Sequence, residues 1–186
     1  MLYLYEQNKD QALYKESLRI LELLKKEQFN KGTHDLGFMM YCSFGNANRL
    51  SAKPAYKEIL LNSAKSLSTR FNPKTGCIKS WDSKNPDDFL VIIDNMMNLE
   101  LLFWATKVSG DSSFYKIAVT HANTTMKNHF RPDYSSYHVI DYDPATGKYG
   151  AMVGNILRLA AGATILLLGG LLLILWRLDR AARKKL

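Results

Sequence analysis

The chain has 186 residues, of which 47% are hydrophobic and 23% are charged. This length supplies one ordinary globular core and leaves little room for a second. The formal net charge of +8 is uneven, because residues 150–186 hold six Lys or Arg against one acid, whereas residues 1–149 hold 19 against 16. The larger part therefore lacks the concentrated basic surface that nucleic-acid binding requires, and we expect no nucleic-acid partner.

The chain contains two cysteines, Cys42 and Cys77, which lie far apart in the sequence. Neither has partners at the spacing of metal ligands, and two residues cannot build a disulfide framework. We therefore expect neither a disulfide framework nor a metal site.

Three segments share one pattern, in which Tyr-Lys begins the segment and Phe ends it. They cover residues 14–29, 56–71 and 115–130. Between these ends, apolar residues recur at helical spacing, and turn-forming residues flank each segment. Each segment is predicted to be one four-turn helix with a single buried face.

Two further helices are predicted at about 35–49 and 89–108, after the first two of these segments. Both are apolar on all sides, which is typical of an inner layer. Outer and inner helices that alternate with a period of about 40 to 60 residues predict an all-α array of helical hairpins. The array is either an open solenoid or a closed toroid.

Asp35 and Asp94 stand at the heads of the two inner helices. A carboxylate there can cap free backbone N–H groups and is favoured by the helix dipole, so either residue alone has a structural interpretation. Each is also followed by a Met-Met pair and by large apolar side chains. The pattern predicts one partly buried acidic pocket, a setting in which carboxylates serve as acid and base.

The sequence changes character after the first 149 residues. Residues 159–176 carry no charge, and 18 helical residues reach about 27 Å, close to the thickness of a bilayer core. A buried core helix is the alternative, although such a helix usually carries a polar stripe. We expect a linker at 150–158, a single transmembrane helix at 159–178 and a basic tail at 179–186 on the cytoplasmic side. The side on which the preceding domain lies stays open, because a tail anchor would leave it in the cytoplasm.

The most specific signals are four stretches: HDLGFMMYCSFGNANRL, IKSWDS, IIDNMMNLELLFWA and SSYHVIDYDPATGK. They resemble the unsaturated glucuronyl hydrolases of glycoside hydrolase family 88, and the resemblance covers residues 1–148. It implies a partial six-hairpin α/α toroid at 1–149, with about five to six of the twelve helices. The implied activity is hydrolysis of oligosaccharides that polysaccharide lyases leave, which carry a 4,5-unsaturated uronic acid at the non-reducing end.

By the same resemblance, Asp94 is the acid that protonates C4 of the unsaturated sugar and then activates the water that adds at C5. Asp35 is the neighbouring carboxylate that favours the protonated form of Asp94 and orients the ring. His138 matches a position that lines the sugar site, with a surface or structural role as its alternative. Trp81 supplies a stacking face for a sugar, with a core position as its alternative. Hydration of an enol ether needs only a proton donor and a placed water, so no cofactor is expected.

The remaining histidines, His34, His121 and His129, show no pattern beyond structural roles. Because the resemblance covers only part of a toroid, a second function stays open. It is a non-catalytic, membrane-anchored helical module from a truncated or fused gene, which binds sugars weakly or interacts with other proteins. An open toroid is also expected to expose inner-layer residues and to self-associate through them. The residues expected to be exposed are Met96, Leu99, Leu102 and Phe103.

Overall fold

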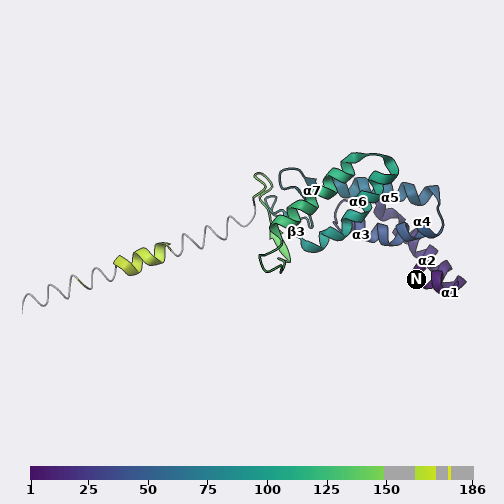
Figure 1. Ribbon diagram of the computed structural model, residues 1–186, viewed down its shortest axis with the longest axis horizontal. Coiled ribbons are helices and arrows are strands. Elements are labelled where there is room, and N and C mark those ends of the chain that lie inside the picture. Colours follow the sequence, from purple (N-terminus) through teal and green to yellow (C-terminus); the bar gives the residue numbers. More distant parts are fainter. Residues whose placement is uncertain (149–161, 171–175, 177–186) are drawn as a thin grey trace, which may run out of the picture. The chain divides into compact units, whose positions relative to one another are not determined.

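The computed structural model describes residues 1–148, 162–170 and 176. The chain divides into two compact units, Met1–Tyr149 and Gly150–Leu186. The first unit carries every candidate site residue, and helices make up most of it (Figure 1).

The three predicted outer helices are confirmed. The first is α2 (Gln11–Leu24), which continues as the 3-10 helix η1 (Lys25–Phe29). The second is α5 (Pro54–Ser68), and the third is α7 (Ser112–Asn128). A short helix, α1 (Leu2–Asn8), precedes them.

The starts of the outer helices follow the turn residues in the sequence. The side chain of Asp10 accepts the N–H of Ala12 at 2.8 Å, and the side chain of Asp111 accepts the N–H of Ser113 at 2.8 Å. Each bond satisfies a backbone donor that the first turn of a helix leaves free. Pro54 begins α5, where its missing N–H costs no hydrogen bond.

The first inner helix is present as predicted, in three consecutive pieces. They are α3 (Leu36–Met40), the π-helical turn η2 (Tyr41–Gly45) and α4 (Asn46–Leu50). The second inner helix is α6 (Leu99–Ser109), which packs against α3, α5 and α7. These helices bury one continuous apolar core, whose fully buried members include Leu36, Met40, Leu60, Leu67, Leu101 and Leu102.

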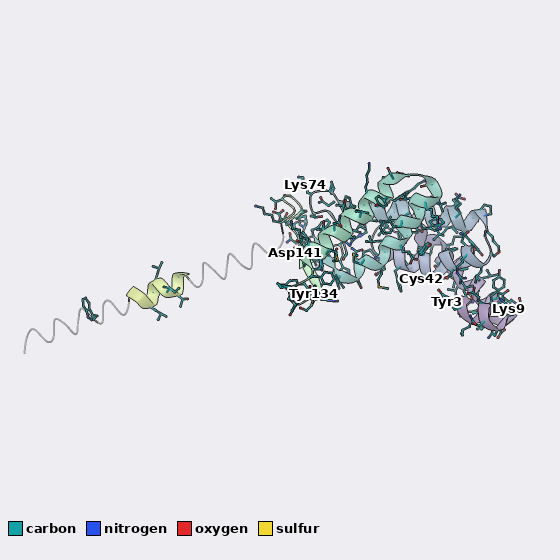
Figure 2. All side chains as sticks on the ribbon, in the orientation of Figure 1. Tyr3, Lys9, Cys42, Lys74, Tyr134 and Asp141 are labelled. Atoms are coloured by element: carbon teal, nitrogen blue, oxygen red, sulfur yellow. The ribbon has the colours of Figure 1, made fainter. Side chains whose placement is uncertain are left out.

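The expectation of an all-α body is wrong at one end of this unit. Strand β1 (Phe71–Asn72) pairs antiparallel with β2 (Cys77–Ile78), and β3 (Leu90–Ile92) pairs antiparallel with β4 (Val139–Asp141). Figure 2 shows Lys74, which follows β1, and Asp141 at one end of the helical body and Tyr3 at the other. Short apolar runs fit a buried strand as well as a buried helix, so periodicity alone did not separate them.

The helix predicted at 89–108 is therefore shorter than expected. Strand β3 takes its first residues, the 3-10 helix η3 (Ile93–Asn98) follows, and α6 begins only at Leu99. Val91 and Ile92 are β-branched and buried, which favours a strand. Asp94 consequently lies in a 3-10 turn ahead of the inner helix.

The predicted exposure of inner-layer residues is wrong for Leu99 and Leu102, which are 4% and 0% exposed. Both face the core because α6 is covered by three other helices. Phe103 is 41% exposed and contacts the ring of Tyr115, and Met96 is half-buried. Self-association stays a prediction.

In the second unit, residues 162–170 are helical. No helix among the described residues is both long enough and apolar enough to cross a membrane. Half of the predicted transmembrane helix at 159–178 lies outside the described residues. The predicted linker at 150–158 and the basic tail at 179–186 lie wholly outside them.

Candidate active site

Asp35 and Asp94 meet at one buried histidine, His34. The residue His34 is 3% exposed, and its Nε2 lies 3.3 Å from Oδ1 of Asp35 and 3.5 Å from Oδ1 of Asp94. The two carboxylates are far apart in the sequence, and the structure brings them to a single nitrogen atom. His34 comes from the loop before α3 and Asp94 from η3, so two separate elements build the cluster.

The expectation of a partly buried acidic pocket needs correction. The side chains of Asp35 and Asp94 are 57% and 49% exposed, whereas that of His34 is 4% exposed. The apolar faces of α3 and α6 point to the core, whereas Asp35 just before α3 and Asp94 within η3 are exposed. The carboxylates are therefore open to solvent, and the imidazole that they both contact is the buried residue of the three.

Asp35 does not cap the helix that it begins. It is the N-cap residue of α3, yet its side chain makes no capping hydrogen bond. The side-chain oxygen of Asn98, in η3, instead accepts the N–H of Phe38 at 2.8 Å. Asp35 therefore does not act as a cap in this turn; its carboxylate accepts the hydroxyl of Thr33 at 3.3 Å and faces His34.

A glycine allows α3 and η3 to approach. A Cβ atom at Gly37 would lie 2.6 Å from the backbone oxygen of Asn98, closer than real Cβ contacts permit. A side chain at this position would push α3 away from η3. Gly37 thus helps to set the separation of Asp35 and Asp94.

His34 is held from behind by Ser80. Its Nδ1 lies 2.8 Å from the backbone oxygen of Ser80. Ser80 is fully buried, and its own hydroxyl accepts the N–H of Ile92 at 2.9 Å. Asn95 donates to the backbone oxygen of Ile78 at 2.7 Å, so buried polar bonds tie β2 to η3 and the loop after β2 to β3. These bonds fix the histidine relative to both aspartates.

Arg70 supports the same loop. Its guanidinium donates to the backbone oxygens of Lys79 at 2.8 Å and Ser80 at 3.3 Å, and to that of Lys31. It also forms an ion pair with Asp82 at 3.2 Å. Arg70 thereby joins the segment before His34 to the segment that carries Ser80. A surface depression of about 640 Å³ lies beside Arg70, and neither Asp35 nor Asp94 lines it.

The two predicted sugar-binding residues, Trp81 and His138, contact the site in different ways: Trp81 through its side chain and His138 through its backbone. The ring of Trp81 packs edge-on against His34, with centroids 5.6 Å apart, and is 38% exposed. Trp81 is therefore beside the cluster rather than in the core. His138 reaches the site through its backbone, because its carbonyl oxygen accepts the N–H of Ile93 at 3.0 Å, and its side chain is exposed.

Another buried histidine supports this region from α7. Nδ1 of His121 accepts the N–H of Ile78 at 3.1 Å, which holds β2 against α7. Burial lowers the pKa of His121 to about 4, with a smaller contribution from His129. Both effects keep the ring neutral. Within the described part of the chain, no group of three or more His, Cys, Asp or Glu side chains is arranged to hold a metal ion.

The sequence did not predict the buried histidine between the two aspartates or the residues that hold this site in place. They are His34, Ser80, Arg70 and Asn98. The role of each depends on a partner distant in the sequence, and helical spacing carries no signal for such contacts. His34 had one local signal, because it directly precedes Asp35 in the His-Asp dipeptide.

Comparisons with known proteins give the geometry its context. No protein-family profile matches the chain. The unsaturated glucuronyl hydrolase of Formosa agariphila is 54% identical over 127 residues, which cover 67% of this chain and 32% of that protein. The chain is a relative of the unsaturated glucuronyl hydrolases. The resemblance predicted from the four sequence stretches is thus confirmed.

Two further similar proteins agree with this relationship. The unsaturated chondroitin disaccharide hydrolase of Streptococcus pneumoniae is 34% identical over 116 residues, which cover 62% of this chain and 29% of that protein. A crystal structure of an unsaturated glucuronyl hydrolase specific for heparin matches with a TM-score of 0.76 and 51% identity. That match covers 80% of this chain and 40% of the solved chain. The mostly helical body thus has the fold of part of this α/α toroid, and the chain spans about a third of the curated relatives.

Proposed function

We propose that this site hydrates the 4,5 double bond of an unsaturated uronic acid at the non-reducing end of an oligosaccharide, and so releases that sugar. One observation carries the proposal: Asp35 and Asp94 both lie within 3.5 Å of Nε2 of His34, with their carboxylates exposed. Two acids that share one imidazole can keep a proton available to a bound substrate.

The chemistry needs one group that gives a proton and takes one back. Asp94 gives its proton to C4, and the electron pair of the double bond forms the new C–H bond. The positive charge that develops at C5 is shared with the ring oxygen. Water adds at C5 and returns a proton to Asp94, and the hemiketal opens to release the next sugar. The donor is restored, so general acid and base catalysis by one carboxyl completes the cycle.

The neighbouring residues fit supporting roles in this scheme. Asp35 contacts the same nitrogen of His34 as Asp94, so its exposed carboxylate is placed to orient the sugar ring beside the proton donor. Trp81 offers an exposed ring next to the cluster, where a sugar can stack. His138 is exposed beside the start of η3, in reach of a substrate that covers Asp94.

The names of the relatives support glycosaminoglycan fragments as the substrate class. One relative acts on an unsaturated chondroitin disaccharide, and one solved neighbour is specific for heparin. Both names point to acidic sugars that a lyase has cleaved. We therefore infer an unsaturated uronic acid linked to an amino sugar as the first substrate to try.

Loss of the ultraviolet absorbance of the unsaturated uronate tests the proposal. A purified unsaturated disaccharide is mixed with the wild-type chain at high concentration, and with Asp94→Asn as the matched control. The proposal requires a loss with wild type and almost none with the variant. If the absorbance does not fall with wild type, or falls equally with both proteins, the proposal is wrong and the non-catalytic module is the better description.

Membrane attachment through residues 159–178 stays a prediction that rests on sequence alone. Its support is the uncharged run at 159–176 and the basic residues that follow it. Alkaline extraction of membranes from cells that express the full chain tests it. A chain that ends at residue 149 is the control and should be released. Release of the full chain as well would count against an anchor.

A further inference from the structure

The hydrogen bond between His34 and Ser80 determines which ring nitrogen carries a proton. Nδ1 of His34 lies 2.8 Å from the backbone oxygen of Ser80. A carbonyl oxygen only accepts hydrogen bonds, so Nδ1 is the donor and is protonated. Nε2 is then the only ring atom whose protonation can change. The rigid, buried surroundings of Ser80 keep this tautomer in place.

Nε2 faces acceptors on its open side. Oδ1 of Asp35 is at 3.3 Å and Oδ1 of Asp94 is at 3.5 Å, yet Nε2 has no hydrogen bond of good geometry within the described residues. Without a proton, a lone pair on Nε2 would face two anionic oxygen atoms. One proton on any of the three atoms turns this repulsion into attraction. Contacts of this kind often shorten when a substrate binds.

The charges around His34 favour the same outcome. Two acids approach Nε2, whereas Arg70 acts from the Nδ1 side, where it donates to the carbonyl oxygen of Ser80 at 3.3 Å. The positive charge of Arg70 is paired with Asp82 at 3.2 Å. The net charge next to Nε2 is therefore negative, which attracts one proton to the cluster.

We propose that His34 is a positioning residue that shares a single proton with Asp35 and Asp94 through Nε2. The catalytic part rests on the proposed function; the sharing of the proton rests on geometry alone. When Asp94 gives this proton to C4, the two carboxylates and the lone pair of Nε2 face one another without a proton, which favours the return of one proton to the cluster. The water that adds at C5 supplies the proton that restores Asp94. The cluster therefore gains and loses no net proton in one turnover.

Two substitutions separate the support that His34 gives to Ser80 from its contact with the acids. His34→Asn keeps an N–H group near the position of Nδ1 and loses the atom that reaches the carboxylates. His34→Gln places an amide nearer to Nε2 and so restores a polar contact there. We expect His34→Asn to have the same unfolding temperature as the wild-type chain. Its kcat should be about a hundredfold lower. KM should change little, and His34→Gln should recover part of the rate.

Nitrogen NMR of the imidazole rings tests the shared proton without any turnover. In the wild-type chain, we expect His34 to be protonated at Nδ1 throughout the pH range in which the chain is folded. The Nε2 signal of His34 should move in both Asp35→Asn and Asp94→Asn. His121 is the internal control, because its Nδ1 accepts a hydrogen bond and its signals should not respond to either change.

The results distinguish a failed inference from a failed function. If the chain does not hydrate the sugar but the His34 signals respond to both aspartates, the proton is shared and only the proposed function is wrong. If Nε2 carries the fixed proton, or if neither aspartate affects its signal, the inference is overturned whatever the activity. A folded His34→Asn with the wild-type kcat and pH profile would also overturn it.

Discussion

The side-chain oxygen of Asn98 accepts the backbone N–H of Phe38 at 2.8 Å. This bond joins η3, which carries Asp94, to the first turn of α3, which follows Asp35. Because Asn98 supplies the cap, the carboxylate of Asp35 is left to face His34 and solvent. The separation of the two acids thus depends on a residue that touches neither of them.

Asn98→Ala should weaken both the fold and the site. The substitution leaves a helix N–H without its buried partner, which costs about 1–2 kcal/mol in the free energy of unfolding. Urea unfolding measures this loss. Asn46→Ala is the matched control, because Asn46 bonds only within its own helical segment at the surface, and it should cost less than about 0.5 kcal/mol. Equal losses would show that Asn98 is not a special cap.

Gly37→Ala should separate α3 from η3. The added Cβ would lie 2.6 Å from the backbone oxygen of Asn98, and relief of this contact should cost about 1–3 kcal/mol. The rate of sugar hydration should fall with it, because both acids must reach one substrate. Gly32→Ala is the control, since its Cβ would meet only Asn30 at 3.4 Å. If Gly37→Ala keeps the wild-type rate and stability, Gly37 does not set the separation of α3 and η3.

His121 should make the fold sensitive to acid. Its pKa is lowered from the ordinary 6.5 to about 4 by burial, so the unfolded chain takes up this proton first as the pH falls. The stabilisation is complete above pH 6.5 and is lost as the pH approaches 4, by about 3 kcal/mol in total.

Unfolding experiments across this pH range check the contribution of His121. His121→Asn keeps an acceptor for the N–H of Ile78 but cannot take up a proton in this range. The difference in stability between wild type and this variant should therefore shrink as the pH falls. A difference that does not change with pH would mean that His121 does not titrate on unfolding.

Cys77 should report global unfolding through its thiol. It is fully buried, and burial raises its pKa to about 12, although a bond from Tyr142 acts in the opposite direction. Cys42 is exposed. A thiol reagent at mildly alkaline pH should label one cysteine in the folded chain, and the second only after denaturant is added. Cys42→Ser should abolish the early reaction. Two early reactions in the native wild-type chain would contradict this burial.

The sequence predicted the helices of this body better than its irregular parts. The outer helices were found because Tyr-Lys starts, apolar spacing and turn residues agree with one another. The strand β3 was missed because Leu90, Val91 and Ile92 are equally apolar in a helix and in a buried strand. Its pairing with β4 depends on residues about fifty positions later, which no local pattern reports.

In the candidate site, too, residues with a local sequence pattern were predicted, and residues that depend on distant contacts were not. Asp35 and Asp94 were identified because each heads an apolar helix and is followed by a Met-Met pair, and the family resemblance gave them roles. His34 was placed among structural residues, since its importance arises from contacts to Ser80 and Asp94 that only folding creates. The exposure of the acids was also missed, because the sequence does not show which end of a helix reaches solvent.

The fate of a solvent deuteron tests the hydration mechanism most directly. The unsaturated disaccharide is turned over in heavy water, and the product is examined by proton NMR at early times. The account predicts one deuteron on C4 of the released uronate with the wild-type chain, and almost no product with Asp94→Asn. A cleaved sugar without deuterium at C4, or the same product from both proteins at the same rate, would contradict proton donation by Asp94.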